Sequence, residues 1–295
     1  RKALGSDDIE YDLKSILPWE RHRRVADRYH VGRVFIAGDA AHQYSPTGGL
    51  GMNTGIQEAV DIAWKLSAVL NGWGGDALLD SYFTERRPVA IRNNEEATAN
   101  FKKIAELPSG AAIDQDTPAG DALRARAQEV VENGGFNEEY EQEGITVGYR
   151  YDTSPICIDD GTGFPALTIT EYEQSARPGA RAPHVWLAEG RSTLDLFGKD
   201  FTLLRLGKDA PDAPALIAAA AACGMPLAVE QVDSDDACAT YACALCLVRP
   251  DGHVAWRGDA DPANAGAIID VVRGAGSDGL RTNADAFAKS GLEAA

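Results

Sequence analysis

The hydrophobic pattern divides the chain into a helix-rich first part and a last third of short apolar runs separated by turn residues. The most informative segment lies in the first part. An apolar run at 33–37 ends at Gly38-Asp39, a glycine-rich loop with Pro46 follows, and a long amphipathic helix is expected to begin near Asn53. A strand, an acidic residue, a glycine loop and a helix N-terminus in this order predict a ligand site at the carboxyl end of the strand.

Two long helices are predicted after the glycine loop. In the first, apolar positions recur at the helical period and form one broad face. This face consists of Ile56, Ala59, Val60, Ala63, Leu66, Ser67 and Leu70. Thr54 and Gln57 are spaced as a capping box, and the glycine-rich stretch 72–75 is a stop signal. The second helix is expected at 78–104, with Pro88 as a break or kink inside it.

The chain length predicts about two domains, since ~100–200 residues per domain is usual. Residues 1–150 are expected to form the first domain, the last part of which, 107–150, is acidic and helix-prone. Residues 151–182 are rich in Pro, Gly and Thr and are expected to be an extended linker that crosses a surface. A second domain is expected at 183–276, and 277–295 are expected to be a tail.

The second domain is predicted to alternate strands and helices. The predicted strands are 184–188, 201–206, 227–232, 242–248 and 253–257. A helix is expected at 213–223, and the last two strands are expected to form a hairpin around the turn sequence Arg249-Pro250-Asp251-Gly252. Asp261-Pro262 is expected to open a final helix that ends near Arg273.

Composition narrows the possible partners. The net charge of −17 disfavours a nucleic-acid partner, because phosphate backbones are bound by Lys and Arg. No apolar run is long enough to span a membrane. Five cysteines without a disulfide-scaffold pattern favour a reducing cytoplasm. The chain opens with Arg1 rather than Met, and we therefore expect it to be the carboxyl-terminal part of a longer protein.

Residues 38–53 resemble the second flavin fingerprint of the single-component FAD-dependent aromatic hydroxylases, the group of phenol hydroxylase and para-hydroxybenzoate hydroxylase. That fingerprint reads Gly-Asp-Ala-Ala-His, three residues, Pro, two residues, Gly-x-Gly-x-Asn. The chain meets it without a gap at nine positions: Gly38, Asp39, Ala40, Ala41, His42, Pro46, Gly49, Gly51 and Asn53. Nine spaced matches make a strong signal.

The second domain extends this resemblance. Its predicted order β-α-β-β-β-α and the segment 179–206 are similar to the phenol hydroxylase branch, whose carboxyl-terminal domain is thioredoxin-like. The implied fold class is α/β, with the carboxyl-terminal part of an FAD-binding monooxygenase domain followed by a thioredoxin-like α/β domain. The dinucleotide fingerprint expected for the ADP half of FAD is absent from this chain. Gly274 to Gly279 matches Gly-x-Gly-x-x-Gly, but it follows a predicted helix and is interpreted as a helix end and tail.

The resemblance implies a set of cofactor-binding residues. They are Gly38, Asp39, Pro46, Gly48, Gly49, Leu50, Gly51, Met52 and Asn53. In the family, Asp39 would accept hydrogen bonds from the ribitol hydroxyls of FAD. The loop and the helix N-terminus would lie against the pyrimidine edge of the flavin, where backbone N–H groups stabilise negative charge. Gly51 is expected to face the ring, in a loop that can require a positive φ.

The family reaction uses FAD, NAD(P)H and O2 to hydroxylate a small phenolic or aromatic substrate, and a homodimer is expected. No residue is assigned as a catalytic acid or base, and no metal is expected. His42 invites a general-base role, but within the fingerprint its expected task is to hold the loop by hydrogen bonds. Tyr44 is more often structural in such a position. Ring deprotonation would need groups from outside this chain.

Two alternatives stay open. One is another FAD-dependent oxidoreductase of the same fold, such as an epoxidase or a halogenase-like enzyme. The other is a non-catalytic assembly module built on the thioredoxin-like domain. Cys243 and Cys246 have the spacing of a redox pair, but a predicted strand would throw them onto opposite faces, away from a helix N-terminus. We therefore expect no redox activity from them.

Overall fold

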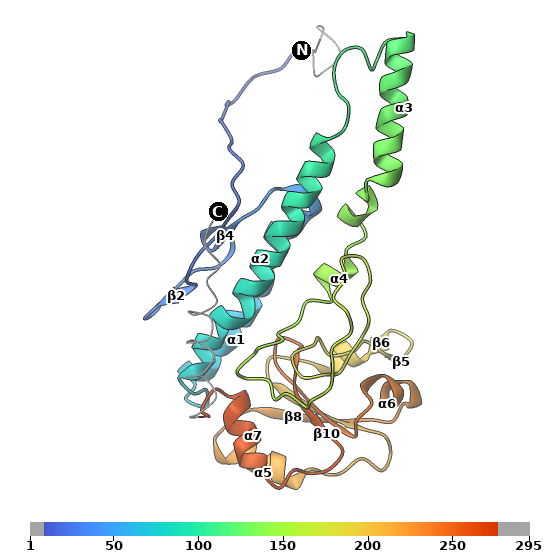
Figure 1. Cartoon of the computed structure of the whole chain (residues 1–295). Coiled ribbons are helices and arrows are strands. Elements are labelled where there is room, and N and C mark those ends of the chain that lie inside the picture. Colours follow the sequence, from blue (N-terminus) through green and yellow to red (C-terminus); the bar gives the residue numbers. More distant parts are fainter. Residues whose placement is uncertain (1–8, 277–295) are drawn as a thin grey trace.

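The computed structural model describes residues 9–276 (Figure 1). Its first part begins with four two-residue strands, β1 (Arg24–Val25), β2 (His30–Val31), β3 (Val34–Phe35) and β4 (His42–Gln43). β2 and β3 form an antiparallel hairpin, and β1 pairs with β4. The strand predicted at 33–37 is therefore shorter than expected. Val34 is 69% exposed, and β3 has a partner strand on one side only among the described residues.

Two long helices follow and lie side by side (Figure 1). α1 (Leu50–Leu70) begins three residues before the expected start, and α2 (Ala77–Ala105) agrees with the second prediction. α2 continues as one helix through Pro88, so Pro88 does not break it. The predicted capping box is wrong. Thr54 lies inside α1, and its hydroxyl donates to the carbonyl of Leu50 at 2.7 Å.

The side of α1 that is buried differs from the predicted apolar face. Ile56, Val60 and Leu70, all on the predicted face, are exposed. The opposite side is buried instead, and it carries charged and polar groups. Its members are Leu50, Thr54, Glu58, Asp61, Trp64, Lys65 and Ala68. Helical periodicity correctly indicated a helix, but it selected the wrong face because the polar groups of α1 find partners far away in the sequence.

Residues 106–182 contain few regular elements. α3 (Pro118–Asn133) projects away from the rest of the molecule, and it is followed by the short α4 (Glu143–Thr146) (Figure 1). Residues 151–182 form no helix or strand, apart from a single bridge between Arg181 and His253. This segment is more than a surface crossing, because Ile156 is fully buried in the main apolar cluster.

The carboxyl-terminal domain contains a four-stranded sheet in the order β10-β9-β7-β8. Its strands are β7 (Phe201–Leu206), β8 (Leu227–Val232), β9 (Leu245–Val248) and β10 (Val254–Gly258). β7 and β8 are parallel, and β9 is antiparallel to both β7 and β10. A separate hairpin, β5 (Trp186–Ala188) with β6 (Arg191–Ser192), precedes this sheet. β7 and β8 match their predicted bounds.

Three helices accompany the sheet: α5 (Pro214–Ala222), α6 (Asp235–Tyr241) and α7 (Ala265–Val272). The sequence did not predict α6, which has only seven residues. α7 begins at Ala265 rather than at Asp261. The carboxylate of Asp261 instead accepts the backbone N–H groups of Ala215 and Leu216, so it caps the start of α5.

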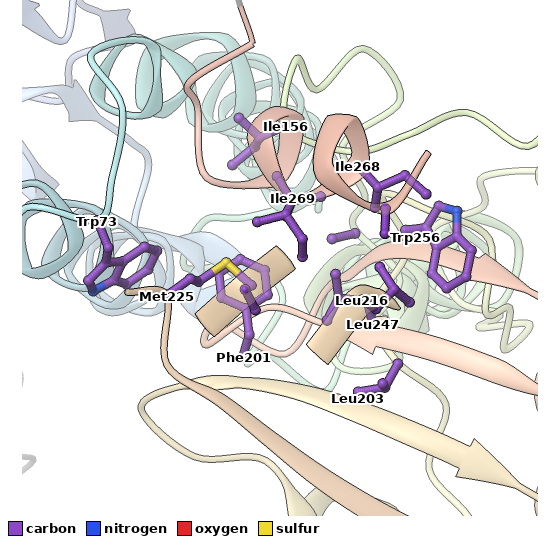
Figure 2. Close-up of a cluster of buried hydrophobic side chains, with 14 of the residues drawn as sticks. Trp73, Ile156, Phe201, Leu203, Leu216, Met225, Leu247, Trp256, Ile268 and Ile269 are labelled. Atoms are coloured by element: carbon purple, nitrogen blue, oxygen red, sulfur yellow. The ribbon is translucent and has the colours of Figure 1, made fainter. Parts of the chain in front are cut away.

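The main apolar cluster joins the two parts of the molecule. Figure 2 shows Trp73, from the α1–α2 connection, beside Phe201 and Met225 of the carboxyl-terminal domain. Trp64 of α1 also packs edge-on against Phe201, with ring centroids 5.8 Å apart. At the end of α7, the carbonyl of Gly274 accepts from the N–H of Ala77. Gly274 follows α7 with φ 73°, as expected for a helix end.

The predicted tail, 277–295, lies outside the described residues. Among the helices of residues 9–276, none has both the length and the apolar character needed to cross a membrane.

Candidate functional site

The turn after β3 carries the acidic residue of the fingerprint. Gly38 to Ala40 form one turn of 3-10 helix, and Asp39 is exposed there. Asp39 lines an open hollow of about 570 Å³, together with residues 23–27 and 40–43. The glycine loop does not line this hollow. The fingerprint therefore presents two surfaces, an acidic turn and a glycine loop.

The glycine loop leads directly into α1. Gly48 and Gly49 have φ values of 82° and 64°, so these two glycines occupy the left-handed region. Gly51 lies in the first turn of α1 and is not in that region, so the expectation of a positive φ does not hold for it. A Cβ added at Gly51 would meet the ring of Tyr44 at 3.7 Å, which is an ordinary contact.

The first turn of α1 is suited to a flat anionic ligand. No side chain among the described residues caps this N-terminus, so its N–H groups keep their donor capacity. Met52 is 74% exposed, and an added Cβ at Gly49 would find nothing within 4 Å. Asn53 ties the first turn of α1 to the glycine loop, because its Nδ2 donates to the carbonyl of Gly49 at 2.8 Å. These features fit the pyrimidine edge of a flavin.

A buried carboxylate that the sequence analysis missed supports the acidic turn. Glu58 of α1 accepts from the N–H of Gly38 at 2.8 Å, and the same oxygen lies 3.1 Å from Nε2 of His42. His42 is buried and stacks on Tyr44 at 4.3 Å between ring centroids. A Cβ on Gly55 would approach the Cα of Gly38 at 3.2 Å, so a glycine there lets α1 lie close to the turn. The geometry fits a structural task for His42.

The glycine loop is also held by residues from the loosely matched segment 107–150. Glu139 accepts from the N–H of Gly48 at 3.0 Å, and Nε2 of Gln142 donates to the carbonyl of Gly48 at 3.0 Å. Gln142 is buried. These contacts span more than ninety positions, which is why no local sequence pattern indicated them.

A second set of buried polar side chains lies further along α1. We call this set the charge cluster. It consists of Asp61, Lys65, Glu85, Arg249 and Asp251. Lys65 Nζ lies 2.8 Å from Asp61 and 2.6 Å from Glu85, and Arg249 contacts all three carboxylates. The carboxylates lie close enough to suggest a metal site, but Lys65 and Arg249 already supply cations among them.

The carboxylates of the charge cluster have divergent pKa values. Burial raises the pKa of Asp61 to about 7, and the neighbouring Glu85 adds to this effect. Burial also opposes ionisation of Glu85, but Arg249 and Lys65 outweigh it and lower the pKa of Glu85 to about 2. Burial thus favours the neutral form of Asp61, whereas Arg249 and Lys65 favour the ionised form of Glu85.

The cysteine pair does not have the predicted geometry. β9 begins at Leu245, so Cys243 precedes the strand, and both Cys243 and Cys246 pack against the same apolar cluster rather than on opposite faces. All five cysteines are free thiols. Burial raises the pKa of the Cys246 thiol well above its ordinary value, which disfavours a reactive thiolate.

Comparison with known proteins gives matches at both ends of the chain. Residues 1–97 match the family model described as FAD binding domain, and residues 175–275 match the aromatic-ring hydroxylase, C-terminal family. Two relatives are the tetracenomycin B2 monooxygenase-dioxygenase of Streptomyces olivaceus and the 4-methyl-5-nitrocatechol 5-monooxygenase of a Burkholderia species. They are 37% and 36% identical to this chain, and each alignment covers 92% of it, with 48% and 49% of the respective relative.

A solved structure gives the same result. The rebeccamycin biosynthetic enzyme RebC with reduced flavin is 45% identical, with a TM-score of 0.79 over 87% of this chain and 48% of that one. The chain thus spans about half the length of the relatives that it matches. Both halves of the predicted α/β fold class, an FAD-binding part followed by a hydroxylase carboxyl-terminal part, are confirmed by these matches. Residues 1–97 are thus similar to FAD binding domains, residues 175–275 are similar to aromatic-ring hydroxylase C-terminal domains, and the chain as a whole resembles one half of FAD-dependent monooxygenases.

Proposed function

We propose that the complete gene product hydroxylates a phenolic or related aromatic compound, and that residues 38–53 of this chain bind the flavin part of FAD. The observation that carries the proposal is the α1 N-terminus, which lacks a side-chain cap among residues 9–276 and follows two left-handed glycines. The matches to the FAD binding and hydroxylase carboxyl-terminal families support it.

The residues of this chain would contribute binding and electrostatics. Bound FAD supplies the electron transfer and oxygen activation that amino-acid side chains cannot provide. The N–H groups at Leu50 to Met52 would stabilise negative charge on the flavin edge without reorganisation. Asp39 would accept hydrogen bonds from ribitol hydroxyls. Pro46, Gly48, Gly49, Gly51 and Asn53 would shape the loop that receives the ring.

The proposal also covers the co-substrates, the oligomeric state, the cellular location and the domain bounds. The co-substrates would be NAD(P)H and O2, and the enzyme would be a cytoplasmic homodimer without a nucleic-acid or membrane partner. Domains would divide at 150 and 183, with 151–182 as the connection. The sheet order β10-β9-β7-β8, with a parallel β7–β8 pair joined through α5, supports a thioredoxin-like assignment of the second domain.

The first test is the spectrum and turnover of the purified complete gene product. We expect a yellow protein with flavin absorbance. It should oxidise NADH or NADPH faster when a phenolic compound is added, with one hydroxylated product formed per reduced nicotinamide consumed. A colourless protein that takes up no FAD would refute the proposal.

The second test addresses Asp39. Losing a charge-assisted hydrogen bond costs about 1.5–3 kcal/mol, so Asp39→Ala should weaken FAD binding roughly ten- to hundredfold. The far-UV circular dichroism should not change, because Asp39 is exposed. Asp233→Ala is the matched control, since Asp233 is an exposed aspartate directly after β8. Equal flavin retention by the two variants would remove Asp39 from the site.

A further inference from the structure

The turn Arg249-Pro250-Asp251-Gly252, here called the RPDG turn, does more than connect β9 and β10. Its arginine is fully buried and points at the helices of the first part. Arg249 binds Glu85 of α2 in bidentate fashion, with Nη1 at 2.6 Å from one carboxylate oxygen and Nη2 at 2.9 Å from the other. Nη2 also lies 3.2 Å from Asp61 of α1. One side chain thus joins both helices across more than 160 positions of sequence.

The charges of α1 and α2 require this contact. Without the RPDG turn, the two helices would bury the carboxylates of Asp61 and Glu85 with a single ammonium, Lys65. A buried carboxylate without a partner is costly, so the helix pair needs a cation from elsewhere. Arg249 supplies that cation to Glu85 and Asp61, and Asp251 enters the cluster from the same turn as a third carboxylate, which is paired with Arg249.

A second route leads from the RPDG turn to the first turns of α1. The guanidinium of Arg86 donates to the side-chain oxygen of Gln57 at 3.1 Å and to the carbonyl of Thr54 at 3.4 Å. Its other nitrogen contacts the hydroxyl of Tyr151 at 3.2 Å. The ring of Tyr151 packs against the imidazole of His253, with ring centroids 4.3 Å apart and planes tilted by 31°, and Nδ1 of His253 lies 3.5 Å from the carboxylate of Asp251. This chain of contacts therefore connects the first turns of α1 to Asp251 of the RPDG turn.

Both routes act on the helix whose N-terminus forms the glycine-loop site. α1 is continuous from Leu50 to Leu70. Asp61 therefore lies about three helical turns after Leu50, since an α-helix has about 3.6 residues per turn. We propose that Arg249 of the RPDG turn is a positioning residue of the flavin site, through which the docked carboxyl-terminal domain holds α1 in its flavin-binding position. This inference rests on the proposed binding of flavin at α1. It gives the RPDG turn a task in cofactor binding beyond the connection of two strands.

The test compares FAD binding in matched variants of the complete gene product. Arg249→Met combined with Glu85→Gln removes one cation and one carboxylate together, so the net charge of the cluster is unchanged. FAD added to the apoprotein should bind this double variant on the order of tenfold more weakly than wild type. Arg249→Lys should give an intermediate loss, because it keeps the charge and loses the bidentate geometry. Wild-type affinity in a folded double variant would overturn the proposal.

Arg257→Met is the control, because Arg257 lies on β10 of the same hairpin but pairs with Asp160 rather than with α1 or α2. It should bind FAD as wild type does. A loss equal to that of the Arg249 variants would show that any weakening of the carboxyl-terminal domain affects flavin, and would contradict a specific role for Arg249.

Hydrogen exchange of the wild-type protein keeps the inference testable if the double variant does not fold. Coupling between two sites is reciprocal, so FAD should slow amide exchange at residues 245–258 by a few fold or more, although these residues lie outside the fingerprint. FAD binding without any change in this segment would refute the positioning role alone. A wild-type protein that binds no FAD would refute the proposed function as well, and its absorption spectrum distinguishes the two results.

Discussion

The two parts of the molecule bury different kinds of side chain. In the carboxyl-terminal domain, β9 is entirely buried and consists of Leu245, Cys246, Leu247 and Val248, and β7 is buried at every residue except Arg205, which is half-buried. In the first part, α1 and α2 bury ionisable groups, among them Glu58, Lys65 and Arg86. Apolar burial is non-directional and needs only contact, whereas each buried charge needs a specific partner.

This contrast explains what each part can do. Apolar packing, as in the cluster around Phe201, needs no particular partner group, and here it also receives Trp64 and Trp73 from the first part. By contrast, the stability of a helix pair held by ion pairs depends on partner groups from the RPDG turn and from the loop before α1. That dependence links the glycine-loop site to the rest of the fold.

The largest expected effect comes from removing one charge of the helix pair. Lys65→Met leaves Asp61 and Glu85 with Arg249 as their only close cation among the described residues. Removal of one partner from a buried ion pair costs about 3–5 kcal/mol of unfolding free energy. Urea unfolding measures this loss, and Lys208→Met, at a surface lysine, should cause no measurable change.

An apolar truncation in the sheet provides the counterpart. Leu203→Ala in β7 should cost about 2–5 kcal/mol through lost burial and the cavity left behind. The loss should be the same at every pH, because no ionisable group is removed. If Lys65→Met proved harmless while Leu203→Ala did not, the first part would owe its stability to packing alone and the contrast would fail.

The pH dependence of stability should also separate the two parts. The pKa of Asp61 is raised from 3.8 to about 7 in the folded protein, so the folded state holds this proton more tightly than the unfolded state. This contribution to stability is complete below about pH 4 and is lost as pH rises through 7, by at most about 1.4 kcal/mol per pH unit.

Asp61→Asn isolates the effect. The variant should gain stability relative to wild type as pH rises from 4 to 7, and the difference should then level off. Contributions from His253, whose pKa is lowered by burial, are common to both proteins and cancel in the comparison. Parallel stability curves for the two proteins across this range would contradict the assignment of the proton to Asp61.

Glycine substitutions in the loop should separate backbone strain from ligand contact. Gly49→Ala places a side chain at φ 64°, which should cost about 1–2 kcal/mol of stability. Gly51→Val should leave apoprotein stability nearly unchanged but should lower flavin occupancy, because Gly51 lies in the first turn of α1 where the ring is proposed to sit. Thermal unfolding and the flavin-to-protein absorbance ratio measure the two effects. Full flavin occupancy in Gly51→Val would move the proposed site away from this turn.

The smallest effect is expected from the cysteine pair of the apolar domain. Cys243→Ser with Cys246→Ala should cost about 1 kcal/mol or less through lost packing. Hydroxylation coupled to NAD(P)H consumption should continue as before, because burial raises the pKa of Cys246 and disfavours the thiolate. Disulfide reductase activity that disappears in this variant would show that the pair has a redox function.

The sequence by itself determined the elements whose hydrophobic period matches their burial. β7, β8 and α2 lie within a residue of their predicted bounds, and the spaced residues of the flavin fingerprint predicted the similarity to FAD-dependent monooxygenases. The sequence did not predict short elements such as α6, because seven residues are too few to show a helical period of apolar positions.

Only the tertiary structure decided which face of α1 is buried and which residues support the site. Ile56 and Val60 are apolar yet exposed, while Asp61 and Lys65 are charged yet buried. The partner of these charges, Arg249, follows more than 180 positions later, and no local pattern encodes such a pairing. The physical reason is that apolar residues reveal their environment through periodicity, whereas a buried charge is stable only beside a partner that the fold brings to it.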